Sequence, residues 1–84
     1  MRREKLLHKA IHSPNNLRFG DMITLTEAFG FSLKRISGGH HIYSHSRIPE
    51  LLNLQNVKGK AKPYQVRQFI DLVERYNLTL ENET

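Results

Sequence analysis

Apolar side chains recur at helical spacing near the start of the chain. The first such segment, Arg2–His12, has an apolar stripe opposite a basic face, and the sequence Ser13-Pro14-Asn15-Asn16 ends it. The second segment is Phe19–Phe29. Gly30 follows at the position where a helix end commonly turns left-handed, and Phe31 can then fold back onto the helix. This pattern predicts two short amphipathic helices.

The middle of the chain alternates between apolar and polar residues, which is the pattern of half-buried strands. We predict strands over Phe31–Ser37, His40–Ser46 and Leu51–Val57. Gly38-Gly39 forms a tight connection between the first two strands, and Arg47-Ile48-Pro49-Glu50 is a turn before the third. Short connections of this kind favour an antiparallel sheet.

A basic loop, Val57–Lys62, leads into the clearest helical stripe of the chain. Pro63 suits the first position of a helix, and apolar residues then follow at i, i+3, i+4 and i+7. Asn77 can close this helix in the left-handed conformation, and we expect the polar tail Thr79–Thr84 to fray. The order helix, helix, three strands, helix predicts one α+β domain. It has a three-stranded antiparallel sheet with helices on one face, and its other face is open.

Basic residues gather in the part of the chain that forms the predicted sheet. The formal net charge is +5, and between positions 34 and 67 seven Lys and Arg residues accompany a single acid, Glu50. Such a surface favours nucleic acid, an anionic membrane or an acidic partner, and a merely solvated face is the alternative. The chain has no cysteine and no apolar run near the roughly 20 residues that span a bilayer. We therefore expect a cytoplasmic protein without a membrane partner.

Three of the five histidines fall within the nine residues Ser37–His45. A histidine can take and give a proton near neutral pH, and surrounding cations suit chemistry on a phosphodiester. In RNA cleavage a base takes the 2′-hydroxyl proton, an acid protonates the leaving 5′-oxygen, and cations stabilise the phosphorane. His40 is our candidate catalytic residue. Strand alternation puts the possible second proton carriers, His41, Tyr43 and His45, on the opposite face, and His40 as a simple polar or phosphate-contacting residue remains the alternative.

The histidine spacing does not favour a metal site. His41 and His45 are about 13 Å apart along a strand, which is too far to share one zinc ion. His8 and His12 have helical i, i+4 spacing, but no third ligand is evident and the helix is basic. We expect no metal, cofactor or small-molecule ligand.

Several residues around His40 are candidates for contact with RNA. Tyr43 and Tyr64 can stack on bases or serve as packing groups. In the segment 58–62 a glycine between lysines permits close approach of the backbone to a phosphate ahead of the Pro-started helix. The candidate RNA-binding residues are Lys34, Arg35, Gly39, His41, Lys58, Lys60 and Lys62.

These features together resemble a known family. The motif Gly38-Gly39-His40-His41-Ile42-Tyr43, a third strand, the Lys58-Gly59-Lys60 loop and the Pro63 helix resemble the HicA toxins, the small ribonucleases of bacterial and archaeal HicA–HicB toxin–antitoxin pairs. The resemblance covers roughly residues 19–78. It implies a double-stranded-RNA-binding-domain-like fold, to which residues 1–14 add an N-terminal helix and residues 79–84 a flexible tail.

The resemblance also implies an activity and partners. By position in the Gly-Ser-His signature, His40 would be the residue needed for metal-independent mRNA cleavage. A HicB-type antitoxin would neutralise the toxin by covering His40 and the basic face. Gly39 replaces the signature serine, so a role of that hydroxyl in phosphate binding would be missing here. Two alternatives to the toxin stay open: a non-catalytic RNA-binding domain, and an interaction module with structural histidines.

Overall fold

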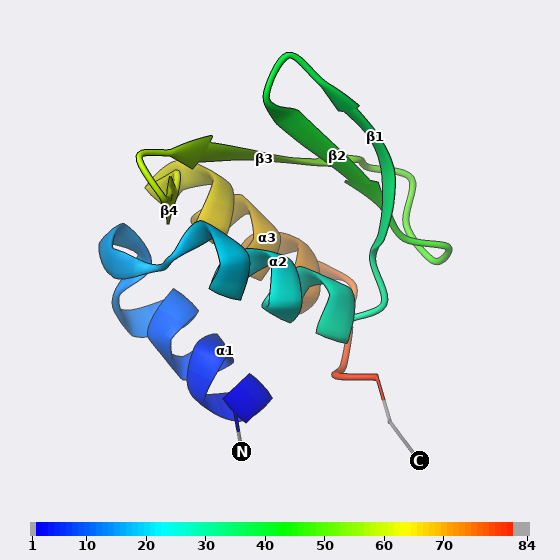
Figure 1. Cartoon of the computed structure of the whole chain (residues 1–84). Coiled ribbons are helices and arrows are strands. Elements are labelled where there is room, and N and C mark those ends of the chain that lie inside the picture. The colour runs from blue at the N-terminus through cyan, green and yellow to red at the C-terminus, as the bar shows by residue number, and fades with distance from the viewer. Residues whose placement is uncertain (1, 82–84) are drawn as a thin grey trace.

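The predicted helices and strands form within two residues of their expected ends. The structure is a computed structural model that describes residues 2–81. Its elements in chain order are α1 Arg2–His12, the 3-10 turn η1 Pro14–Asn16, α2 Phe19–Ala28, β1 Ser32–Ser37, β2 His40–Ser44, β3 Leu52–Val57, β4 Lys60–Ala61 and α3 Pro63–Arg75. The α+β class is confirmed. The helices lie on one side of the antiparallel sheet, and the β1–β2 hairpin rises away from them (Figure 1).

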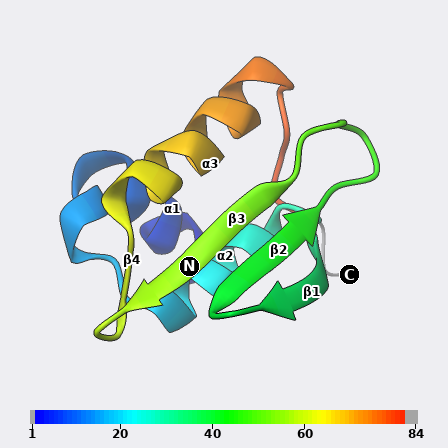
Figure 2. The ribbon, with the colours of Figure 1, turned by 90° about the horizontal axis from the view of Figure 1, so that it is seen from above.

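The prediction of three strands is wrong, because part of the expected basic loop forms a fourth strand. The described residues form one sheet in the order β1-β2-β3-β4, with Lys60 and Ala61 paired to Val57 and Asn56 (Figure 2). Lys58 and Gly59 occupy the turn with φ of 55° and 86°, which permits a two-residue hairpin. Ala61 is buried, and its N–H donates to the carbonyl oxygen of Leu17 at 2.9 Å. The burial of Ala61 and its hydrogen bond to Leu17 thus hold Lys60 and Ala61 beside β3.

The hairpin of β1 and β2 depends on its two glycines. Ser37 pairs with His40, so Gly38 and Gly39 form the whole turn, with φ of 55° and 87°. Two positive φ values in sequence are what a type I′ turn requires, and glycine adopts them without steric cost. At the other end of β1 the register shifts between Leu33 and Arg35, which leaves the intervening Lys34 as a bulge.

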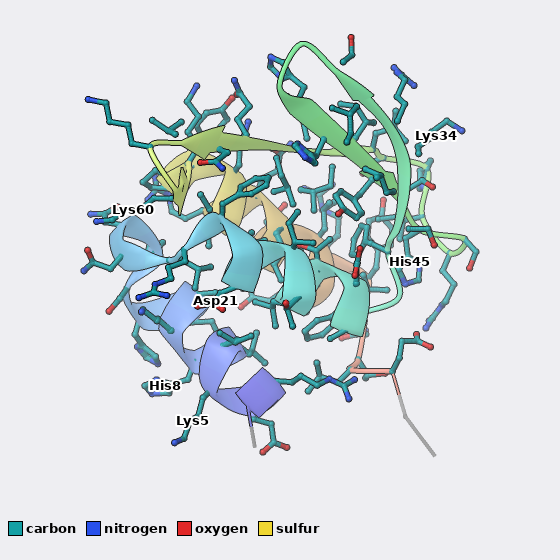
Figure 3. The ribbon with its side chains drawn as sticks, viewed as in Figure 1. Lys5, His8, Asp21, Lys34, His45 and Lys60 are labelled. Carbon is teal, nitrogen blue, oxygen red and sulfur yellow. The ribbon has the colours of Figure 1, made fainter. Side chains whose placement is uncertain are left out.

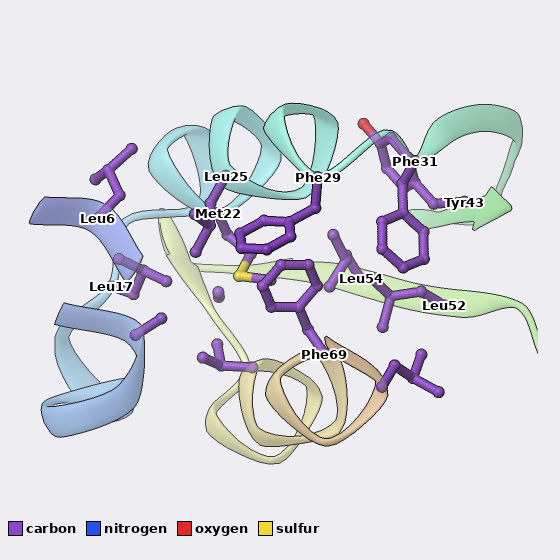
Figure 4. Packing of buried hydrophobic residues seen from close by; sticks show 14 of the residues in the cluster. Leu6, Leu17, Met22, Leu25, Phe29, Phe31, Tyr43, Leu52, Leu54 and Phe69 are labelled. Carbon is purple, nitrogen blue, oxygen red and sulfur yellow. The ribbon is translucent and has the colours of Figure 1, made fainter. Parts of the chain in front are cut away.

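The core lies between the sheet and α2 and α3. Phe29 and Phe31, at the end of α2, pack against Phe69 of α3, with ring centroids 5.5 and 5.9 Å apart (Figure 4). Leu52 and Leu54 of β3 are fully buried beside them. Gly30 has φ of 93° and ends α2 as predicted, which returns Phe31 to the core.

Helix α1 and the segment after α3 close the helical layer. Leu6 and Ala10 of α1 are buried against the main core. Asn77 has the predicted left-handed conformation, with φ of 53°, and the N–H of Glu81 donates to the carbonyl oxygen of Ala28 at 2.6 Å. The last residues of the predicted tail, 82–84, lie outside the described residues. Within residues 2–81 no helix combines the length and the apolar character needed to cross a membrane.

Candidate nucleic-acid interface

Strand register separates the histidines of β2 onto two faces of the sheet. Tyr43 pairs with Leu52 and is buried, so the side chains at 41 and 43 face the helices. His40 pairs with Gln55 and faces the other way, onto the open side. The register therefore confirms the predicted separation of His40 from His41 and Tyr43, while His45 lies beyond the end of β2 and is buried.

The imidazole of His40 is held on one edge and free on the other. Its Nδ1 lies 3.1 Å from Oδ1 and 2.8 Å from Nδ2 of Asn53, a diagonal neighbour on β3. Its Nε2 has no hydrogen-bond partner among residues 2–81, and it is not a buried atom. The half-buried ring therefore presents one nitrogen to whatever binds the open face.

A second polar group links the open face to the start of α3. The buried side chain of Gln65 accepts a hydrogen bond from the backbone N–H of Gln55 at 2.8 Å and donates to Gln55 Oε1 at 2.9 Å. In this way Gln65 takes the place of a neighbouring strand where β4 is too short to reach. The ammonium group of Lys62 donates to Gln55 Oε1 at 3.5 Å and lies 5.4 Å from the ring centroid of Tyr64. Gln55 is the cross-strand partner of His40, so Lys62 is bonded to the residue that pairs with the histidine.

The side chains of His41, Tyr43 and His45 pack on the helical side of the sheet. His41 packs edge-on against Phe19, with centroids 5.0 Å apart, and its buried Nδ1 has no hydrogen-bond partner in the described part of the chain. His45 is buried and bonds through both ring nitrogens to backbone groups. The hydroxyl of Tyr43 donates to Glu27 at 3.4 Å, and burial together with this carboxylate raises the pKa of Tyr43 to about 12. The structure thus leaves His40 apart from the three possible second proton carriers.

The predicted cations border the open face instead of forming one cluster. Lys34 and Arg35 are exposed on β1, and Lys58 and Lys60 are exposed at the β3–β4 turn, at the other edge of the sheet. Figure 3 shows Lys34 and Lys60 on these opposite sides of the molecule. A polyanion that crossed the sheet from β1 to β4 would meet a cation at each end and His40 between them.

Three polar residues at this face were not among the sequence-predicted site residues: Asn53, Gln55 and Gln65. A signal for the first two is present in the sequence, because the alternation of Leu52 and Leu54 sends the residues at 53 and 55 to the open face beside the second strand. Gln65 has no such signal, since its position on the final helix reads as a polar surface residue.

The described residues contain no group of three or more His, Cys, Asp or Glu side chains placed to hold a metal ion. The rings of His8 and His12 lie side by side on α1, with centroids 4.3 Å apart. This pair lies on the helical side of the molecule, away from the sheet (Figure 3).

Comparison with known proteins places the chain in no family: no protein-family model, no curated protein and no solved structure matches it significantly. The fold and the site define the class instead. It is a small α+β domain whose open sheet face carries polar side chains together with Ile42 and Val57, a half-buried histidine in that face and cations along its edges.

Proposed function

We propose that this protein is an endoribonuclease of the HicA toxin type, with a double-stranded-RNA-binding-domain-like fold, and that His40 is its catalytic residue. The observation that carries the proposal is the imidazole of His40, which is anchored at Nδ1 by Asn53 and free at Nε2 on the open face. A histidine held in this way has a fixed direction for proton transfer, which general acid–base catalysis requires.

The proposed reaction uses the ribose 2′-hydroxyl as nucleophile. Nε2 of His40 takes the hydroxyl proton, the 2′-oxygen bonds to phosphorus, and the bond from phosphorus to the 5′-oxygen breaks. The leaving 5′-oxygen then receives that proton from Nε2 of His40, so the products are a 2′,3′-cyclic phosphate and a 5′-hydroxyl. Lys62, which donates to Gln55, the cross-strand partner of His40, is the candidate to supply positive charge to the phosphorane. DNA lacks the nucleophile, so the reaction is selective for RNA.

The cations at the sheet edges support mRNA as the substrate and an acidic protein as the inhibitor. Lys34, Arg35, Lys58 and Lys60 carry exposed positive charge on both sides of His40. Contacts to phosphates from such residues give affinity without reading the base sequence. A HicB-type antitoxin with an acidic surface would be attracted to the same residues and would cover His40. We therefore propose that the protein acts in the cytoplasm, together with its mRNA substrate and its antitoxin.

The test is cleavage by the purified protein of an RNA oligonucleotide, with the DNA oligonucleotide of the same sequence as substrate control. We expect cleavage of RNA alone, products with cyclic phosphate ends, and loss of cleavage in His40→Ala. His8→Ala, which alters an exposed histidine on α1, is the matched control and should retain full activity. Cleavage that persists in His40→Ala would contradict the proposal.

A non-catalytic RNA-binding domain is the second candidate. It is favoured by one observation, namely that no second histidine or carboxyl group of the described residues forms a hydrogen bond with His40. The same assay separates the two candidates. RNA binding that weakens with salt, without cleavage by the wild-type protein, would establish the second one.

A further inference from the structure

The side-chain amide of Asn53 reaches His40 with both of its polar atoms. Nδ1 of His40 lies 3.1 Å from Oδ1 and 2.8 Å from Nδ2. A bond to Oδ1 requires a proton on Nδ1, whereas a bond from Nδ2 requires that Nδ1 has none. The amide orientation therefore decides which nitrogen of the neutral ring carries the proton, and hence whether Nε2 can act as a base.

We propose that Asn53 is the positioning residue for His40, and that its Oδ1 accepts the hydrogen bond from Nδ1–H. This inference rests on the proposed function of His40 as a general base. A half-turn of the amide exchanges its oxygen and nitrogen, so the pair can settle with Oδ1 as the acceptor. The proton then stays on Nδ1, and the lone pair of Nε2 points to the open face.

The hydrogen bond from Nδ1–H of His40 to Oδ1 of Asn53 is present both before and after Nε2 takes a proton. It therefore suits a residue that takes and returns a proton. When Nε2 takes the proton of the 2′-hydroxyl, the ring becomes an imidazolium that still carries Nδ1–H, and the bond to Asn53 Oδ1 is retained. When Nε2 returns that proton to the leaving 5′-oxygen, the same neutral tautomer is restored. In this role Asn53 acts through the ring of His40.

Two features of the fold keep Asn53 in place. It pairs with Ile42, two positions along from His40, so its side chain lies on the same face and within reach of the ring. The residues on either side of it, Leu52 and Leu54, are fully buried, which fixes the direction of β3 at this point. The amide is thus carried by a rigid strand and not by a loop.

The experiment is nitrogen NMR of His40 in the folded protein, which reports the tautomer without any substrate. We expect the neutral wild-type ring to carry its proton on Nδ1, and Asn53→Leu to shift the neutral ring toward the Nε2–H form. Asn53→Asp should keep the proton on Nδ1 and move the midpoint to higher pH, because a carboxylate favours the imidazolium. Asn56→Asp is the matched control: it adds the same charge on β3 and keeps the acceptor for Gly59 N–H, and Asn56 does not contact His40.

Cleavage assays on the same variants give the catalytic readout. Asn53→Leu should lower the cleavage rate about tenfold or more, because part of the acceleration by general base catalysis is lost. Asn53→Asp should raise the pH at which the cleavage rate begins to increase. A wild-type ring with its proton on Nε2, or a tautomer unchanged in Asn53→Leu, overturns the inference even if cleavage depends on His40. If the tautomer follows Asn53 but the wild type cleaves no RNA, the proposed function fails and the control of the ring by Asn53 stands.

Discussion

The imidazole of His45 donates a hydrogen bond from Nε2 to the carbonyl oxygen of Phe29, 3.0 Å away, and so joins the segment after β2 to the end of α2. Its Nδ1 accepts a bond from the backbone N–H of Arg47 at 3.1 Å. One ring nitrogen donates and the other accepts, which defines a neutral ring. His45 therefore belongs to the scaffold, although it stands in the same histidine-rich segment as His40.

We expect His45→Ala to lower the free energy of unfolding by about 2–4 kcal/mol, since it opens a cavity and leaves a buried carbonyl oxygen unpaired. His45→Gln, which can still donate to Phe29, should lose less. Urea denaturation measures both. A loss below about 1 kcal/mol in His45→Ala would show that the two hydrogen bonds contribute little.

Position 39 favours glycine because of its backbone conformation, and not because a side chain there would lack space. Its φ is 87°, and a Cβ placed there would meet no atom within 4 Å. Gly39→Ala and Gly39→Ser should each cost about 1–2 kcal/mol from the left-handed backbone. Gly20→Ala is the control, because Gly20 lies in α2 with open space around it and alanine there should stabilise by roughly 0.5–1 kcal/mol. Equal thermal shifts in the two positions would contradict this account.

The hydroxyl group of Tyr43 should make the free energy of unfolding depend on pH in the alkaline range. Its pKa of about 12 in the folded protein exceeds the ordinary value of 10.0, because burial and Glu27 disfavour the phenolate. The unfolded chain releases the proton first, so the free energy of unfolding should be unaffected at neutral pH and fall as the pH rises from about 10 toward 12.

Tyr43→Phe should reduce this alkaline loss, while at neutral pH it removes only a 3.4 Å hydrogen bond. Urea unfolding from about pH 9 to about pH 11 measures the slope. Part of the slope will remain in the variant, because Glu50 also raises the pKa of Tyr76. An identical slope in the wild type and in Tyr43→Phe would contradict the assignment to Tyr43.

The cations at the two edges of the sheet should contribute separately to RNA binding. Lys34→Ala and Lys60→Ala should each weaken affinity and reduce the slope of log K against log salt by roughly 0.7–0.9, the value for one phosphate contact. Lys5→Ala, on exposed α1 and away from the sheet, should change neither quantity (Figure 3). A slope that falls only in Lys34→Ala would place the RNA on the β1 side alone.

Local patterns in the sequence were sufficient to predict most of the fold. The helical stripes, Gly30, the Gly38-Gly39 turn and Pro63 each act over a few residues, and each predicted element forms. The fourth strand was missed because Lys60-Ala61 is too short to show alternation. It forms through a long-range contact of Ala61 with Leu17, which no local pattern contains.

The sequence was sufficient to predict the face of the sheet on which His40 lies, but not the residues that contact it. Alternation around His40 correctly gave its face and that of His41, because strand period depends only on position. The contact with Asn53 depends on the register between β2 and β3, and the approach of Lys62 depends on the packing of α3 through Gln65. Both contacts depend on tertiary structure, so the sequence could name the cations but could not say which one bonds to the strand partner of His40.

The bulge at Lys34 lies on an edge strand, where a second copy of this chain would add to the sheet. β1 is exposed along all six residues and has a free edge, the kind of surface on which proteins add strands to one another and aggregate. The extra residue interrupts the ladder there, and Lys34 and Arg35 add two positive charges to this edge strand in every copy. The opposite edge is only two residues long and is held by the Arg18–Lys60 bridge. A bulge, edge charges and a short edge strand are features that limit the addition of strands from another molecule.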